Sequence, residues 1–183
     1  MSNLPNIYDL EEDKSARDLT FLFISSGEQD IIKAIQYSFV QNLHGRAVYN
    51  LGFGDYDPEA DVIIDNINTN NGDAYKVLHT VLSTIPGFFR NYPDAYLMVQ
   101  GSDGRPEFIK NCRTTCTKNC DEECKNFNRR INIYRHYVNK NYEQLNIDYQ
   151  FLGGAMQADS SIYLEDYATH KAYDSVILLK RNV

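Results

Sequence analysis

The chain has 183 residues, of which 43% are hydrophobic and 23% are charged, and its net charge at pH 7 is −7. This length suits one globular domain, and this hydrophobic content excludes an intrinsically disordered chain. The negative net charge argues against a protein whose whole surface binds nucleic acid or anionic lipid.

Two features of the sequence bear on its compartment. No stretch approaches the roughly 20 consecutive apolar residues that a membrane-spanning helix needs. The first 18 residues are polar and acidic, without the basic start and apolar run of a secretory signal. We therefore expect a cytoplasmic protein, in which the four cysteines are thiols or metal ligands rather than disulfides.

The first third of the chain is predicted to form strands. We interpret residues 1–18 as a polar N-terminal arm and residues 19–183 as a single domain. Runs of β-branched and aromatic residues, separated by glycine, proline and aspartate turns, then predict four strands. Their expected spans are 19–26, 31–39, 46–54 and 61–67, with a short helix as the alternative for 31–39.

A helix is expected to follow Asn70-Asn71-Gly72-Asp73, where Asn71 or Asp73 suits the N-cap position. Apolar residues continue at helical spacing, and Pro86 is expected to kink or end the helix. Lys76 in the first turn is expected to point to solvent. The expected buried face consists of Val77, Leu78, Val81, Leu82 and Ile85.

The remaining elements complete an α+β domain. Residues 95–100 predict a strand, the apolar spacing over 131–145 predicts a second long helix, and two strands are expected near 147–152 and 174–181. This order favours a mainly antiparallel sheet packed with two principal helices. A cysteine-rich insertion is expected at about residues 103–128.

Several short motifs stand at the ends of these elements. They are Tyr49-Asn50-Leu51-Gly52-Phe53-Gly54-Asp55, Asn70-Asn71-Gly72-Asp73 with Lys76-Val77-Leu78, Gly101-Ser102, and Arg130 with Tyr134. As a set they resemble an uncharacterised bacterial domain-of-unknown-function family with YNLxFGD and NNGDxxKVL motifs. The resemblance extends over roughly residues 20–180 and supports the fold without implying an activity. The long segment between Ser102 and Arg130 departs from the family pattern and is interpreted as an insertion.

Four cysteines recur at every fourth position within this insertion. They are Cys112, Cys116, Cys120 and Cys124. Four thiolates can complete a tetrahedral Zn²⁺ site, but on one continuous helix this row would extend over about 18 Å. The chain must therefore turn near residues 117–119 for one ion to be held. The alternatives are thiols without metal, or disulfides formed on oxidation, and the spacing matches no common iron–sulfur pattern.

Positive charge is concentrated in residues 105–140, which carry nine Lys or Arg and four Asp or Glu. Basic and aromatic side chains alternate along the helix expected there, a combination that binds phosphates and stacked bases. The alternative is a solvated helix face that balances an acidic neighbour. The candidate residues for binding nucleic acid are Lys110, Arg113, Lys118, Lys125, Arg129, Arg130, Tyr134 and Arg135.

A second set of polar residues could form an enzyme site. Carboxylates can bind Mg²⁺ or transfer protons, a lysine in the first turn of a helix can hold an anion, and a serine can act as a nucleophile. The alternative is that these residues only form turns and helix caps. The candidates are Asp55, Asn71, Asp73, Lys76, Ser102 and Arg130.

The sequence thus favours a small intracellular binding module over an enzyme. Its partner would carry phosphate, most plausibly as nucleic acid, and would meet a basic surface ordered by zinc. The alternative is a small hydrolase or transferase, and a third reading is an adaptor whose acidic body binds a protein. A binding module predicts basic residues exposed on one surface, whereas an enzyme predicts polar groups converging in a cleft.

Overall fold

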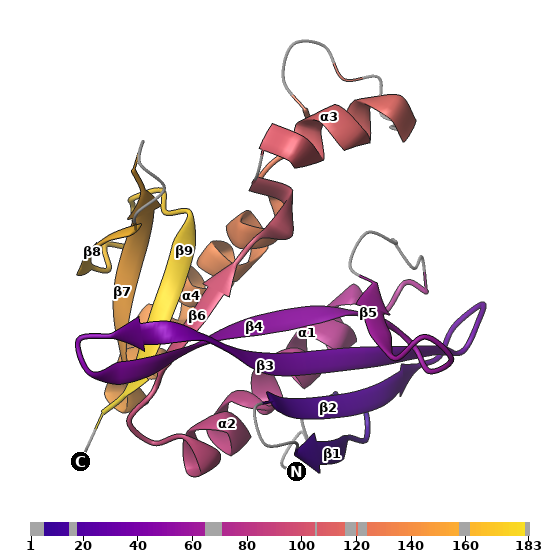
Figure 1. The fold of residues 1–183 in the computed structure, drawn as a ribbon, viewed down its shortest axis with the longest axis horizontal. Helices are drawn as coiled ribbons and strands as arrows, with labels where there is room; N and C mark the ends of the chain where they lie inside the picture. The colour runs from indigo at the N-terminus through magenta and orange to yellow at the C-terminus, as the bar shows by residue number, and fades with distance from the viewer. Residues whose placement is uncertain are drawn as a thin grey trace. The chain divides into compact units, whose positions relative to one another are not determined.

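The computed structural model describes residues 6–14, 18–64, 71–104, 106–115, 120, 124–157 and 162–181. The side chains of residues 106, 107, 111, 113 and 115 lie outside this description. Nine strands are described in all, together with four α-helices and one short 3-10 helix (Figure 1). The contacts group the chain into two compact units, Met1–Ala95 and Tyr96–Val183, and the single domain over residues 19–183 stays a prediction.

The first unit is built on an antiparallel sheet. β1 pairs with β2, β2 with β3, β3 with β4, and the short β5 with the end of β4. The bounds of these strands are β1 Glu11–Lys14, β2 Asp18–Ser25, β3 Ile31–Leu43, β4 Arg46–Asp57 and β5 Val62–Ile64. All four predicted strands are present, although residues 65–67 of the fourth lie outside the described residues. β1 lies within the segment that we expected to be an arm.

The β3–β4 hairpin is longer than the sequence predicted. Its turn consists of His44 and Gly45, whose φ angles are 50° and 79°. Positive φ at both central residues is what a two-residue hairpin turn requires, because its twist then matches that of the strands. The pairing continues to the turn with one irregularity between Phe39 and Gln41.

Two helices follow the strands of this unit, α1 Ala74–Ser83 and α2 Ile85–Asn91. Pro86 lies in the first turn of α2, where its missing N–H group leaves no hydrogen bond unmade, so the predicted helix break is confirmed. The expected buried face is only partly correct. Val81 and Ile85 are buried, while Val77, Leu78 and Leu82 are half-buried.

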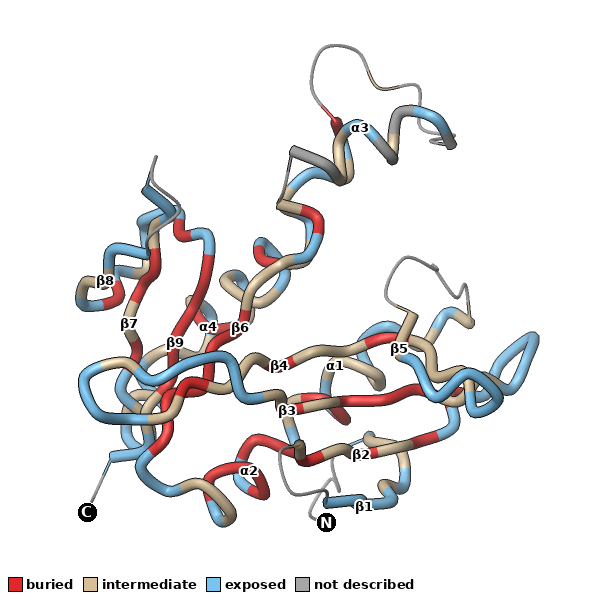
Figure 2. The backbone as a smooth tube through the Cα atoms, viewed as in Figure 1, coloured by how far each residue is buried: buried red, intermediate tan, exposed pale blue. Residues whose placement is uncertain are grey.

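The core of the first unit lies between one face of the sheet and these helices. Alternate residues of β2 and β3 point to this face, and they include Phe21, Ile35 and Tyr37. The Tyr37 ring stacks on Phe88 of α2 at 4.7 Å between ring centroids, and its hydroxyl lies 2.6 Å from Thr84 Oγ1. Figure 2 shows the buried residues along β2, β3 and α2.

The second unit contains an antiparallel sheet in the order β6, β9, β7, β8. Its strands are β6 Tyr96–Gln100, β7 Tyr149–Met156, β8 Ile162–Asp166 and β9 Ser175–Lys180. Its helices are the 3-10 helix η1 Ser102–Gly104, α3 Pro106–Thr115 and α4 Arg129–Asp148. The sequence predicted β6, α4, β7 and β9, but not α3 or β8.

The long helix α4 packs on this sheet through aromatic contacts. The Tyr142 ring lies 5.8 Å from the Phe151 ring of β7, and the Tyr167 hydroxyl donates to Asn139 Oδ1 at 2.7 Å. Non-helical backbone angles at Asn141 mark a kink in the helix. Ile131 and Val138 are the buried residues of this helix.

The predicted fold class is confirmed. The protein is α+β, its sheet is mostly antiparallel, and two helical regions, α1–α2 and α4, pack on the strands of their own units. Within the described residues, no helix is both long and apolar enough to cross a membrane.

Candidate functional site

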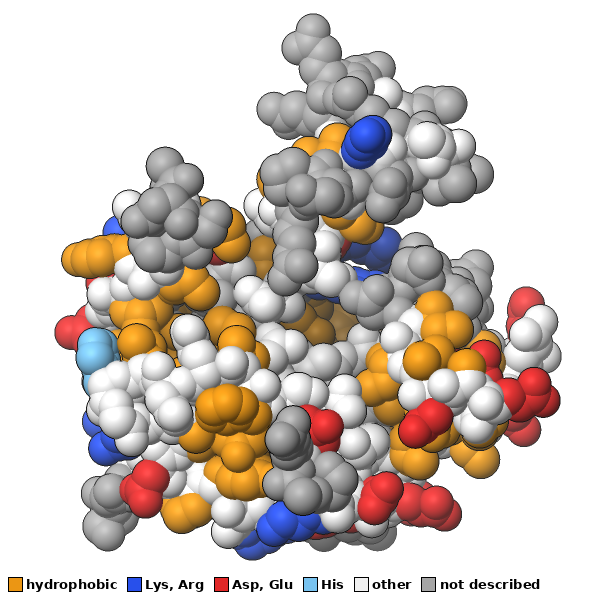
Figure 3. Space-filling view, viewed as in Figure 1, with side chains coloured by type: hydrophobic (Ala, Val, Ile, Leu, Met, Phe, Trp, Pro, Cys, Tyr) orange, Lys and Arg blue, Asp and Glu red, His pale blue; other side chains and the backbone are white. Residues whose placement is uncertain are grey.

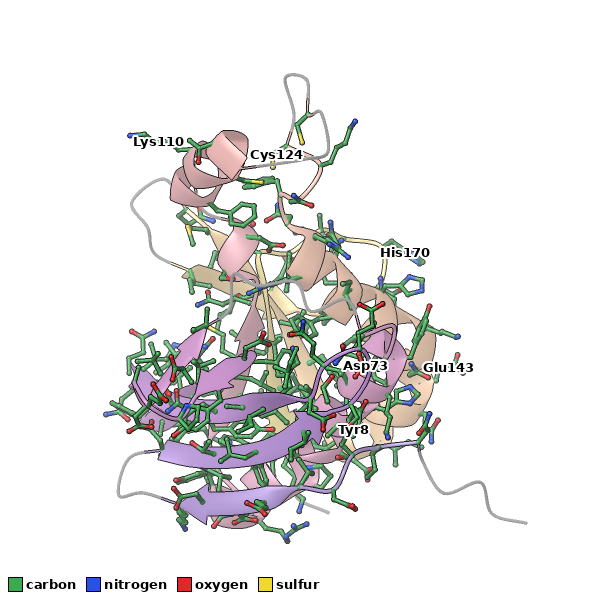
Figure 4. All side chains as sticks on the ribbon, turned by 90° about the vertical axis from the view of Figure 1, so that its right-hand side faces the viewer. Tyr8, Asp73, Lys110, Cys124, Glu143 and His170 are labelled. Carbon is green, nitrogen blue, oxygen red and sulfur yellow. The ribbon has the colours of Figure 1, made fainter. Side chains whose placement is uncertain are left out.

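Polar side chains of the first unit meet where β2 ends and α1 begins. Asp73 Oδ2 accepts hydrogen bonds from the Ser25 hydroxyl at 2.6 Å and from the Tyr8 hydroxyl at 2.7 Å. Asn71 Nδ2 donates to Ser25 Oγ at 3.0 Å and to the Gln29 carbonyl at 2.9 Å. Figure 4 shows Tyr8 and Asp73 next to each other. We call Tyr8, Ser25, Asn71 and Asp73 the Asp73 cluster.

The hydrogen bonds of the cluster shape the charge of Asp73. Burial raises the pKa of its carboxyl, but hydrogen bonds from Ser25 and Tyr8 and the charge of Lys33 bring the pKa below its ordinary value of 3.8. Burial and the bond to Asp73 raise the pKa of the Tyr8 phenol. Asp73 is therefore a charged acceptor, and Tyr8 is a neutral donor.

A buried ion pair lies beside the cluster. Lys33 and Asp55 are direct cross-strand partners in β3 and β4, and their side chains form a salt bridge. Lys33 is only 4% exposed, and its ammonium also lies 6.0 Å from the centre of the Phe53 ring. A buried ammonium without a partner would strongly destabilise the fold. Asp55 therefore has a structural role, which is to pair with Lys33.

Lys76 does not extend into solvent as expected. Its Nζ lies 3.7 Å from the centre of the Tyr8 ring, which is cation–π geometry. Asp73 stands at the N-cap of α1, but its side chain makes no capping hydrogen bond to that helix. The predicted N-cap position of Asp73 is therefore confirmed, but the capping hydrogen bond is not made, because the carboxylate bonds to Ser25 and Tyr8.

The Asn71 side chain also fits closely against the β2–β3 turn. A Cβ atom on Gly27 would lie 2.6 Å from Asn71 Cγ, so only glycine leaves room for the amide. Asn71, Asp73 and Asp55 thus bond to other parts of their own unit. These contacts give the three residues structural roles within the fold.

The two remaining residues of the candidate enzyme site lie in the second unit. Arg130 Nη1 donates to Ser102 Oγ at 2.6 Å, and the Arg130 backbone N–H donates to Asp103 Oδ2 at 2.9 Å. A guanidinium only donates hydrogen bonds and stays charged, so it cannot take a proton from Ser102 as a general base. The pair offers donors suited to an anion. Four of the six candidates lie in one unit and two in the other.

The basic residues expected to bind nucleic acid fall into three groups. Lys110, Lys125 and Arg129 are exposed. Arg130 bonds to Ser102, and Arg135 donates to Asn132 Oδ1 at 3.1 Å and to the Lys171 carbonyl at 3.2 Å. The Arg113 side chain and Lys118 lie outside the described residues. Arg135 therefore joins α4 to the segment before β9, a structural contact.

Tyr134 does not stand out from α4 as a stacking platform. It is half-buried, and burial raises the pKa of its phenol. Another aromatic residue is better exposed: Phe127, at 37%. It lies between two exposed cations, Lys125 and Arg129. An aromatic residue between two basic residues is visible in the sequence Lys125-Asn126-Phe127-Asn128-Arg129. The sequence-based prediction placed the stacking residue in the following helix instead, at Tyr134.

Backbone hydrogen bonds hold this segment in a defined turn. The Phe127 N–H donates to the Cys124 carbonyl at 2.9 Å, and the Asn128 N–H donates to the Asp103 carbonyl at 3.2 Å. Asn128 has a positive φ of 56° and is the N-cap residue of α4. We call Lys125, Phe127 and Arg129 the basic turn.

The cysteines contact the same turn. The structure describes Cys112, Cys120 and Cys124. Cys112 Sγ accepts from Asn126 Nδ2 at 3.4 Å, and Cys120 Sγ accepts from the Lys125 N–H at 3.3 Å. Cys124 is buried. Cys116 lies outside the described residues, and within them no three His, Cys, Asp or Glu side chains are grouped to hold a metal ion.

Residues 5–128 match the model of a family described as Family of unknown function (DUF6934). The chain belongs to this family. The DUF6934 match contains the Asp73 cluster and ends at Asn128, immediately before α4. No curated protein and no solved structure matches the chain.

Proposed function

We propose that this DUF6934 protein is a binding module for single-stranded nucleic acid and that the basic turn is its contact surface. The observation that carries the proposal is the exposure of Phe127 between Lys125 and Arg129. A ring of this kind stacks on bases without regard to sequence, and neighbouring cations contact the phosphates.

The distribution of charge along the chain supports the basic turn as the contact surface. Residues 105–140 have a net charge of +5, although the whole chain is at −7. Lys110 projects from α3 and adds a third exposed cation to those of the basic turn (Figure 4). Acidic residues elsewhere repel a polyanion, so a nucleic acid is directed to this segment.

A zinc ion bound by Cys112, Cys116, Cys120 and Cys124 is part of the proposal. The sulfurs of Cys112 and Cys120 already accept hydrogen bonds from Asn126 and Lys125, so ordering them would also order the turn. We further infer that residues 103–128 are a cysteine-bearing elaboration of the family pattern. The proposal keeps the cytoplasmic location expected from the sequence.

Salt-dependent binding tests the contact surface. Three phosphate contacts should give a slope of about −2 for log K against log salt concentration, at about −0.7 per contact on a single strand. We expect Arg129→Ala to bring the slope closer to zero by about 0.7. Phe127→Ala should weaken binding about tenfold without changing the slope, because stacking releases no counterions.

Two matched controls come from the same unit. Lys180→Ala removes an exposed lysine outside the basic segment, and Ile147→Ala removes a side chain of α4 that is 69% exposed. Neither should alter oligonucleotide affinity in a fluorescence anisotropy titration at low salt. Equal losses for Lys180→Ala and Arg129→Ala, or no binding to any of several oligonucleotides, would contradict the proposal.

Elemental analysis tests the zinc. Protein purified without added metal should contain one zinc per chain, and a chelator should weaken oligonucleotide binding. A folded, metal-free protein with four titratable thiols would remove zinc from the proposal, while leaving the salt-dependence test of the basic turn valid.

A further inference from the structure

The Tyr8 side chain occupies a well-defined ring site on the first unit. One ring face stacks on Phe23 of β2, with centroids 5.3 Å apart and an interplanar angle of 18°. Lys76 Nζ lies over the ring, 3.7 Å from its centre. The hydroxyl donates to Asp73 Oδ2 at 2.7 Å, and the Tyr8 backbone N–H donates to Thr80 Oγ1 at 2.9 Å.

The residues that form this site are held in place by bonds that do not involve Tyr8. Ser25 donates to Asp73, Asn71 donates to Ser25, and Thr80 Oγ1 donates to the Lys76 carbonyl at 2.8 Å within α1. Phe23 is only 3% exposed and also stacks on Phe53. A stacking surface and a charged acceptor are therefore held by contacts that do not involve Tyr8.

The segment that carries Tyr8 leads into the edge of the sheet. Tyr8 precedes β1, an edge strand of four residues, all exposed, which pairs only with β2 among the described strands. Lys14 Nζ adds a bond to Asn91 Oδ1 at 2.8 Å in an exposed position. Segments with few buried contacts open locally at low free-energy cost.

We propose that this site is a binding site for a phenolic ring supplied in trans, which the N-terminal segment occupies in cis. When Tyr8 leaves, the Asp73 carboxylate loses a donor and Lys76 loses its ring. A ligand restores both contacts only if it is flat, aromatic and carries a hydroxyl opposite its point of entry. The inference does not depend on the proposed nucleic-acid binding, since it concerns residues of the first unit alone.

The ring can come from a small phenol or from a tyrosine of a polypeptide, and Thr80 distinguishes these sources. Only a tyrosine within a peptide supplies a backbone N–H to Thr80 Oγ1, as Tyr8 does. N-acetyl-L-tyrosinamide should therefore bind more tightly than p-cresol if the source is a polypeptide. Thr80→Val should abolish this difference, whereas equal affinities would assign the site to free phenols.

The full-length Tyr8→Ala variant provides the main test, by calorimetry and by amide chemical shifts. We expect p-cresol to bind it about tenfold more tightly than toluene does, because only p-cresol donates to the charged Asp73. The double variant Tyr8→Ala/Asp73→Ala should bind the two equally. Equal binding of p-cresol and toluene to Tyr8→Ala, or binding of neither, overturns the proposal.

Hydrogen exchange of the unchanged protein tests the same point if Tyr8→Ala does not fold. Amides of residues 8–14 should exchange faster than those of β2 and β3, and excess N-acetyl-L-tyrosinamide or p-cresol should accelerate them further. The proposal is overturned if the amides of residues 8–14 exchange only when the whole protein unfolds and neither compound changes their rate. Tyr8 would then be a fixed part of the core.

Discussion

Asp73 occupies the N-cap position of α1, yet its carboxylate accepts hydrogen bonds from Ser25 and Tyr8, residues 48 and 65 positions away. The sequence indicated a short polar side chain at a helix start, and such residues usually bond to the first turn. Donors brought close by the tertiary structure compete for the same oxygen. The residue type was therefore predictable, and its bonding was not.

This environment predicts an acid-dependent loss of stability. Burial raises the pKa of Asp73, but its hydrogen bonds lower the pKa to below 3.8 in the folded protein. A depressed folded pKa stabilises the protein above the unfolded pKa, and this stabilisation is lost as the pH falls towards the folded value. The stability difference between the wild type and Asp73→Asn should shrink below about pH 4 in urea titrations. A difference that is constant from pH 3 to 7 would contradict this assignment.

The Lys33–Asp55 pair leads to a second prediction at the residue scale. Asp55→Ala leaves the buried Lys33 ammonium without its cross-strand partner, so we expect a loss of about 3 kcal/mol in the free energy of unfolding. Glu59→Ala is the control, because it removes an exposed acid from the turn after β4. It should change stability by less than about 0.5 kcal/mol. Similar effects of the two changes in denaturant titrations would mean that the ion pair is not buried.

Among the elements, α1 shows how far periodicity can predict packing. Helical spacing identified an apolar face, but it did not distinguish its centre from its edges. Val81 is 2% exposed, whereas Leu78 is half-buried. The sheet and α2 decide which apolar residues are enclosed, and neither is visible in the spacing of α1.

The relative burial of these two residues can be measured. Val81→Ala removes two buried methyl groups and leaves a cavity, so we expect a loss of about 2 kcal/mol. Leu78→Ala should cost less, although it removes more atoms, because solvent already reaches that side chain. A larger loss for Leu78→Ala in urea unfolding would show that α1 faces the sheet differently.

The β3–β4 hairpin gives a second prediction at this scale. Gly45 has a φ of 79° with no heavy atom within 4 Å of an added Cβ, so Gly45→Ala should cost about 1 kcal/mol through backbone strain alone. Gly52 lies within β4, where an added Cβ meets its nearest neighbour at an ordinary 3.7 Å. Gly52→Ala should therefore be neutral or stabilising. A lower melting temperature for Gly52→Ala but not for Gly45→Ala would contradict the described hairpin.

At the scale of the whole molecule, charge is unevenly distributed along the chain. Acidic side chains gather at the β2–β3 and β4–β5 turns of the first unit (Figure 3), and the residues concerned are Glu28, Asp30, Asp57, Glu59 and Asp61. The basic residues are concentrated in 105–140, within the second unit. Such a molecule repels polyanions over much of its surface while offering them a local site.

The same charge balance predicts a solubility minimum. The isoelectric point calculated from the sequence is about 5.0, and the net charge at pH 7 is −7. Loss of net repulsion promotes association, so solubility should be lowest near pH 5 and should recover at pH 7. Turbidity measured from pH 4 to 8 checks this expectation. A minimum near pH 7 would mean that local charge, rather than net charge, controls association.

The sequence by itself determined the elements with strong local signals: the predicted strands, the helix break at Pro86 and the span of α4. These follow from alternation, helical spacing and proline geometry, which act over a few residues. It did not predict β1, α3 or β8, because short polar segments carry weak periodicity. Only the tertiary structure decided which polar residues meet. It joined Tyr8, Ser25 and Asp73 in one unit and Ser102 and Arg130 in the other, since contacts between distant residues depend on packing rather than on spacing along the chain.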